Sequence, residues 1–171
     1  MLFADVRGYT KLTESLAPAE VPALVNRFYE HASAALLRHE GLLGQIEGDN
    51  VMGLFVPGLA GREYRRQAVE GGIGLMRAVG PESDLALEIG IGIATGEEFV
   101  GNVGGGGYKD FAAVGDVTNL AARLTAQAAG REILVDEATY EEVREEHPHA
   151  ERRELELKGK GIVTVHVIRA H

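Results

Sequence analysis

The chain has 171 residues, no cysteine and a formal net charge of −9 at pH 7. A chain of this length buries about two thirds of the surface that its unfolded form exposes, so one domain over residues 1–171 is expected. The lack of cysteine excludes disulfides and thiolate metal sites and favours a reducing compartment, so a cytoplasmic location is expected. The negative charge argues against nucleic acid as a partner. No apolar run approaches the roughly 18 residues of a membrane-spanning helix, so no direct membrane contact is expected.

The first half of the chain predicts a strand, a helix and a hairpin. An apolar run at the N-terminus ends on Asp5, and apolar residues at helical spacing predict a helix from Pro18 to His39. Short apolar runs at 42–47 and 51–56 flank Gly48, Asp49 and Asn50, a composition typical of a hairpin turn. Asp49 is therefore expected at the hairpin tip.

The second half adds three helices and five strands. Strict alternation over 85–94 predicts a strand with one buried face, followed by a glycine-rich connection at 101–107. The remaining expected helices are 62–79, 116–129 and 137–146, and the remaining strands are 110–114, 133–135, 151–157 and 162–168. The order β-α-β-β-α-β followed by β-α-β-α-β-β predicts an α+β fold with a ferredoxin-like βαββαβ core. We expect its helices on one face of the sheet.

Two carboxylates are expected at neighbouring positions. Asp5 at the end of the first strand and Asp49 at the hairpin tip belong to elements that are neighbours in a βαββ sheet. Together they could bind Mg²⁺ or Mn²⁺, which prefer hard oxygen ligands. The residues alone also allow a structural interpretation, in which Asp5 caps the following helix and Asp49 fills the turn.

A second pair of polar side chains lies on the helix expected from Asp116. Val117, Leu120 and Leu124 form its buried stripe, which leaves Asn119 and Arg123, four residues apart, on another face. An amide and a guanidinium in this arrangement can hold a ribose and a phosphoryl oxygen. An ordinary solvated helix face explains the same pattern.

Five segments in a fixed order carry a resemblance to a known family. The sequence resembles the catalytic domains of class III adenylyl and guanylyl cyclases over nearly its whole length. The segments are FADVRGYT (3–10), EGDNVMGLF (47–55), GIGIATGEEFVGNVG (90–104), DFAAVGDVTNLAARL (110–124) and LELKGKG (155–161).

The resemblance implies an enzyme of intracellular signal transduction that converts ATP or GTP to a 3′,5′-cyclic nucleotide and pyrophosphate. It implies a homodimer with two shared active sites, each with two Mg²⁺ or Mn²⁺ ions. One subunit would hold these ions through Asp5, the carbonyl of Val6 and Asp49. The other subunit would orient the ribose with Asn119 and stabilise the transition state with Arg123.

Further residues are implied to contact the substrate. Lys158 matches a family lysine that contacts the terminal phosphates, although a solvated lysine in a KGKG turn is the plain alternative. The turn at Gly8 and Tyr9, together with Thr10, would approach phosphate at a helix N-terminus. The first strand is shorter than is usual in the family, so reduced stability or dimerisation is expected.

The positions that contact the base depart from the family pattern. Gln45 stands where purine-selective members carry a lysine, and Ala112 stands where they carry an aspartate or threonine. Gln45 can still donate or accept a hydrogen bond, but the side chain of Ala112 can do neither. Selectivity for the base is therefore expected to fall. The resemblance favours ATP over GTP, because most bacterial-looking members of the family use ATP.

The departures at Gln45 and Ala112 keep a second function open. A cyclase-homology module without substantial turnover could dimerise, bind nucleotide and regulate fused domains. TGEEF (95–99) also approaches the GGEEF signature of diguanylate cyclases, but that family has no counterpart to GDVTNLAARL.

Overall fold

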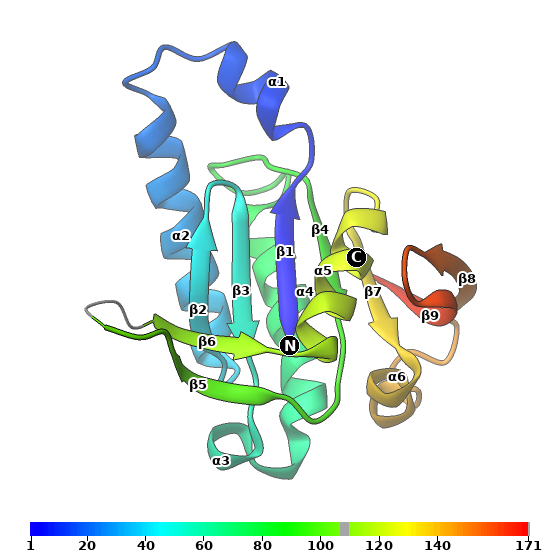
Figure 1. The fold of residues 1–171 in the computed structure, drawn as a ribbon. Helices are drawn as coiled ribbons and strands as arrows, with labels where there is room; N and C mark the ends of the chain where they lie inside the picture. The colour runs from blue at the N-terminus through cyan, green and yellow to red at the C-terminus, as the bar shows by residue number, and fades with distance from the viewer. Residues whose placement is uncertain (107–109, 171) are drawn as a thin grey trace.

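A seven-stranded sheet in the order β2-β3-β1-β4-β7-β9-β8 forms the centre of the protein (Figure 1). The computed structural model describes residues 1–106 and 110–170, without the side chains of residues 45–47, 110 and 111. Strands β4 and β7 run parallel, whereas β1 pairs antiparallel with both β3 and β4. The sheet strands are β1 (Leu2–Val6), β2 (Leu42–Glu47), β3 (Asn50–Leu54), β4 (Ile89–Ile93), β7 (Glu132–Asp136), β8 (Glu151–Leu157) and β9 (Gly161–Arg169).

Helices and a separate hairpin complete the fold. Strands β5 (Phe99–Val103) and β6 (Asp110–Val114) pair with each other and lie across β2 and β3 in Figure 1. In the part of the chain that the structure describes, no helix has the length and apolarity to cross a bilayer. The helical segments are α1 (Tyr9–Glu14), α2 (Val21–Arg38), α3 (Pro57–Ala60), η1 (Gly61–Glu63), α4 (Tyr64–Val79), α5 (Asp116–Gln127) and α6 (Glu137–Val143).

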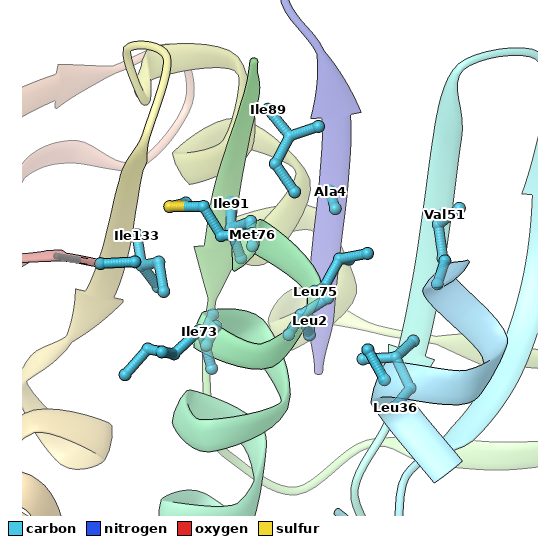
Figure 2. Close-up of a cluster of buried hydrophobic side chains, with 14 of the residues drawn as sticks. Leu2, Ala4, Leu36, Val51, Ile73, Leu75, Met76, Ile89, Ile91 and Ile133 are labelled. Carbon is cyan, nitrogen blue, oxygen red and sulfur yellow. The ribbon is translucent and has the colours of Figure 1, made fainter. Parts of the chain in front are cut away.

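The predicted α+β fold with a ferredoxin-like core is confirmed. Strands β1 to β4 stand in the order β2-β3-β1-β4, and α2 and α4 lie in the two connections that the βαββαβ motif requires. Helix α4 packs closely on the sheet at Gly72, where a Cβ atom would lie 3.4–3.6 Å from Ile133, Leu2 and Ile91. Figure 2 shows the core that results between this helix and the central strands.

The prediction that all helices lie on one face of the sheet is wrong. Leu2, Ala4 and Ile91 face the core that α2 and α4 share (Figure 2). Helix α5 packs on the opposite face, where its Leu124 joins a second core with Leu134 and Val165. The two apolar faces of the sheet are therefore both covered.

Strand β4 explains this difference. The alternation over 85–94 predicted one buried face, but β4 begins only at Ile89 and all five of its residues are buried. A Cβ atom at Gly92 would collide with the α5 backbone at Ala121 and Thr125. The small residues that indicated a solvent-facing side instead mark the place where a helix approaches the strand backbone.

The remaining differences concern short elements and boundaries. Helices α1 and α3 were not predicted, and α2 begins at Val21 rather than Pro18. The connection expected at 101–107 is occupied up to Val103 by β5, and residue 107 lies outside the described part. The hairpin of β2 and β3, the helix α5 and the last two strands follow the prediction closely.

Replacing Gly92 by alanine tests the close approach of α5 to β4. We expect the free energy of unfolding to fall by roughly 1–3 kcal/mol, because the obstacle is backbone rather than a flexible side chain. Chemical denaturation measures the change. Gly58→Ala is the matched control, since a Cβ atom there meets nothing within 4 Å. Equal stability of the two variants would contradict this packing.

Candidate active site

The structure brings Asp5 and Asp49 together at one edge of the sheet. The antiparallel register of β1 and β3 places Asp5 opposite Asn50, next to the turn that carries Asp49. The Val6 amide donates to the Asp49 carbonyl at 3.3 Å, which ties the end of β1 to this turn. Gly48 has a φ of 59°, a conformation that glycine favours at the first central position of a tight hairpin turn. The register therefore places the two aspartates next to each other, as predicted.

The pKa of Asp5 is raised to about 6. Burial is the largest cause, and a hydrogen bond to Asp49 and the negative charge of Asp49 act in the same direction. Arg7 opposes this rise, with Nη1 at 3.5 Å from Oδ2 of Asp5. Two carboxylates that repel each other in a partly buried position form a site that favours a cation.

Tyr29 on α2 holds the turn that carries Asp49. Its hydroxyl donates to the Gly48 carbonyl at 2.5 Å. Burial raises the pKa of Tyr29 above its ordinary value, and the neighbouring Tyr9 and Asp49 raise it further. Helix α2 thus helps to fix the position of the second carboxylate.

Arg7 links the carboxylate pair to helix α5. Its Nη2 donates to the Thr125 carbonyl at 2.7 Å, while Nη1 lies beside Asp5. A Cβ atom at Gly90 would lie 2.6 Å from Nε of Arg7, so glycine provides the space for this side chain. Nε itself is buried and has no hydrogen-bond partner among the described groups.

Helix α5 presents the second group of candidate residues. Ala121, Leu124 and Thr125 are its buried residues, and Asn119 is exposed. The guanidinium of Arg123 donates to the carbonyl of Lys158 in the turn between β8 and β9. The structure therefore brings Arg123 and the predicted phosphate-contacting residue Lys158 together within one chain.

The two groups of residues lie on different elements, the aspartates on β1 and the β2–β3 turn and the others on α5 and the β8–β9 turn. Among the described residues, no hydrogen bond or ion pair joins either aspartate to Asn119, Arg123 or Lys158. Arg7 contacts both Asp5 and α5.

The other predicted substrate contacts lie on three different segments. Gly8 precedes α1 with a φ of 71°, Tyr9 and Thr10 form its first turn, and Thr10 is exposed. Ala112 lies in β6 opposite Gly101 and is partly buried. Gln45 lies in β2, which β6 contacts, but its side chain is outside the described residues.

The donor set fits a hard divalent cation. Asp5 and Asp49 offer carboxylate oxygens at one point, and their mutual repulsion favours a bound positive charge. Among the described residues, no cluster of three or more His, Cys, Asp or Glu side chains is present. Two carboxylates suffice for Mg²⁺, because nucleotide phosphates and waters commonly complete its coordination.

Several residues that shape this site were not predicted. Arg7, Tyr29 and Lys160 act through contacts with distant segments, and Lys160 pairs with Asp116 at 3.1 Å. Arg7 stands inside the motif FADVRGYT, so its place next to Asp5 was a visible signal. Nothing in the local pattern around Tyr29 or Lys160 indicates their partners.

The sequence matches a known family along almost its whole length. The family described as adenylate and guanylate cyclase catalytic domain matches residues 1–170, so the chain belongs to this family. An uncharacterized protein of Mycobacterium tuberculosis is 31% identical over 135 residues, which are 77% of this chain and 24% of that protein. The chain thus spans less than a quarter of the length of this curated relative.

Solved structures of cyclases share the fold. The guanylyl cyclase Cya2 superposes with a TM-score of 0.84 and 27% identity, covering 99% of this chain and 91% of that one. The adenylyl cyclase CyaB from P. aeruginosa gives a TM-score of 0.82 and 29% identity, covering 99% and 93%. The resemblance found in the sequence is therefore confirmed, and the chain is a nucleotidyl cyclase catalytic domain.

Replacing Asp49 by asparagine tests the contact between the two carboxylates. We expect the pKa of Asp5 to fall below about 6, because a neighbouring negative charge is lost. It should stay above its ordinary value of 3.8, because burial is the largest cause of the rise. Carbon-13 NMR titration without divalent metal measures it. Asp84→Asn, at an exposed aspartate, serves as the control and should leave the pKa of Asp5 unchanged. An unchanged value in Asp49→Asn would contradict the geometry.

Proposed function

We propose that this domain converts ATP, in preference to GTP, to a 3′,5′-cyclic nucleotide and pyrophosphate. The observation that carries this proposal is the position of Asp5 beside Asp49, two carboxylates that the β1–β3 register and the hairpin turn hold together and that favour a bound cation. In the reaction, a bond forms between the ribose 3′-oxygen and the α-phosphorus. The bond from that phosphorus to the bridging oxygen breaks, the hydroxyl proton is lost, and pyrophosphate leaves.

Asp5, Asp49 and the carbonyl of Val6 would hold two divalent cations, Mg²⁺ or Mn²⁺. When bound, such cations lower the pKa of a coordinated hydroxyl and neutralise phosphate charge. The peptide chain fixes these ligands in advance, because the Val6 amide is hydrogen-bonded to the Asp49 carbonyl. The carboxylates need no rearrangement of the sheet to act together.

The residues on α5 would act on the ribose and the reacting phosphate. Asn119 is exposed and can donate and accept hydrogen bonds, which suits it to orient the ribose. Arg123 would stabilise the charge that develops on the α-phosphoryl oxygens, a preorganised electrostatic effect typical of phosphoryl transfer. Lys158 and the segment Gly8 to Thr10 would contact the remaining phosphates.

We further propose that two copies of the chain share each active site. Within one chain the aspartates make no bond with Asn119 or Arg123 among the described residues. The β5–β6 hairpin exposes apolar side chains, with Phe99 57% and Val114 53% exposed. A second copy that covers this hairpin would bury these side chains and bring α5 of one chain toward the aspartates of the other.

The preference for ATP rests on the family resemblance, and two positions bear on how selective the site is. Gln45 can hydrogen-bond a purine, but Ala112 offers no side-chain donor or acceptor. The structural relatives include both a guanylyl and an adenylyl cyclase, so the fold is compatible with either base. Ala112 also favours the second candidate function, a dimerising module that binds nucleotide and regulates fused domains without substantial turnover.

Detection of the product separates the two functions. Purified protein with Mn²⁺ and either ATP or GTP should form the 3′,5′-cyclic nucleotide, measured by chromatography, and Asp49→Ala should lose at least about 100-fold in rate because the cation site loses a carboxylate. Asp84→Ala serves as the control, because that aspartate is exposed on the surface. No product from a confirmed dimer with either nucleotide would favour the regulatory module.

Mixing two inactive variants tests the shared site. Asp5→Ala and Arg123→Ala should each abolish turnover and leave dimerisation intact. A heterodimer of the two contains one composite site with all its groups, so mixing should restore a fraction of the wild-type rate. Native mass spectrometry confirms that heterodimers form. If they form and stay inactive, the groups do not combine across an interface.

A further inference from the structure

The N-terminus of α5 receives its cap from another segment of the chain. The first amide groups of a helix have no partner within the helix. In helix α6 the residue before the helix provides such a partner, because the Asp136 side chain accepts a hydrogen bond from the Thr139 amide at 2.9 Å. The residue before α5 is Gly115, which has no side chain to do the same.

Glu98 provides the missing cap. One carboxylate oxygen accepts from the Thr118 amide at 2.6 Å, and the other accepts from the Thr118 hydroxyl at 2.7 Å. Both bonds are short and partly buried, as expected for bonds to a charged acceptor. A carboxylate at this end of a helix is also favoured by the helix dipole. Glu98 and Thr118 are 20 residues apart, so this is a tertiary contact.

Gly115 makes the approach of Glu98 possible. A Cβ atom at this position would lie 3.1 Å from Cγ and from Oε2 of Glu98. A side chain here would therefore press on the carboxylate, which would have to shift by a few tenths of an ångström. The glycine before α5 leaves the space that the Glu98 side chain occupies.

The clamp formed by Glu98 and Thr118 acts directly beside the candidate catalytic residues. Asn119 follows Thr118 in the chain, and Arg123 lies one helical turn further on. At its other end α5 is held by Arg7, which donates to the Thr125 carbonyl at 2.7 Å. Glu98 therefore fixes the end of the helix from which Asn119 projects.

The clamp also joins α5 to the β5–β6 hairpin. Glu98 immediately precedes Phe99, which pairs with Val114 at the base of the hairpin. Val114 in turn precedes Gly115 and the first turn of α5. The hairpin base and the helix are thus fixed relative to each other by one carboxylate.

We propose that Glu98 is a positioning residue for the cyclase reaction, which it serves by fixing the first turn of α5 and thereby the side chains of Asn119 and Arg123. This inference rests on the proposed function. Removal of the clamp should lower kcat more than it changes KM, because Arg123 would act on the transition state rather than on the bound substrate.

Glu98→Val removes both hydrogen bonds, and we expect kcat to fall about 10- to 100-fold from the displacement of α5. Glu98→Gln keeps an acceptor for the amide and a donor for the hydroxyl, so it should recover most of the loss. Glu97→Val is the matched control, because Glu97 is the exposed neighbour. If Glu98→Val keeps the kcat and KM of an active wild type, the proposal is wrong.

A thermodynamic cycle tests whether Glu98 acts through α5. In an Asn119→Ala background, Glu98→Val should cost a smaller factor in kcat than it does in the wild type, because part of what it positions is already absent. Equal factors in both backgrounds would overturn the positioning role. So would a loss of activity that higher protein concentration restores, since that result places the effect in dimerisation.

Two further measurements keep the test independent of folding and of catalysis. If Glu98→Val does not fold, Thr118→Val is the second variant, because it removes the hydroxyl that donates to Glu98 and keeps the negative charge of Glu98. We expect Thr118→Val to lower kcat as well. Wild-type kinetics in that variant would count against the clamp. Hydrogen exchange of the Thr118 amide should become faster in Glu98→Val and stay unchanged in Glu97→Val. If wild-type protein forms no cyclic nucleotide, the proposed function fails, while this exchange result still decides whether Glu98 holds the helix.

Discussion

The antiparallel pairing of β1 with β3 is the constraint on which the candidate site depends. It places Asp5 opposite Asn50, so that the adjoining turn must bring Asp49 beside it. A shift of one residue in this register would turn Asp5 to the opposite face of the sheet and separate the carboxylates. The buried residues Leu2 and Ala4 alternate with Phe3 and Asp5, so the apolar core on one face fixes the register that the site on the other face requires.

Strand β4 provides the second constraint, because two of its residues are glycines without a side chain. At Gly92 the α5 backbone approaches the strand, and at Gly90 the Arg7 side chain occupies the same face. These two glycines determine how near α5 and Arg7 can come to β1. The Thr125 hydroxyl donates to the Phe3 carbonyl at 3.1 Å, which fastens the helix to β1 itself. Close packing on one strand therefore sets the distance between the helix and the carboxylates.

Local signals made the main elements and residues predictable. The alternation of apolar residues predicted β4, apolar residues at helical spacing predicted α2 and α5, and the composition of the turn predicted the hairpin that carries Asp49. The side chains that hold these elements together were not predictable in this way. Arg7, Tyr29 and Glu98 bond to groups 118, 19 and 20 residues away, and no local pattern names such a partner. The two buried faces of β4 were missed because glycine alternating with isoleucine looks like a half-exposed strand.

The same packing holds the two groups of candidate residues on different elements. Asp5 is held at the end of β1, whereas Arg123 is held on α5 by the carbonyl of Lys158. Arg7 contacts both Asp5 and α5, and Glu98 fixes the end of α5 nearest to Asn119. If two copies share each site, the carboxylates of one chain belong to one active site and its α5 belongs to the other. Within one chain, Arg7 then connects the helix that acts at one site with the carboxylate that acts at the other.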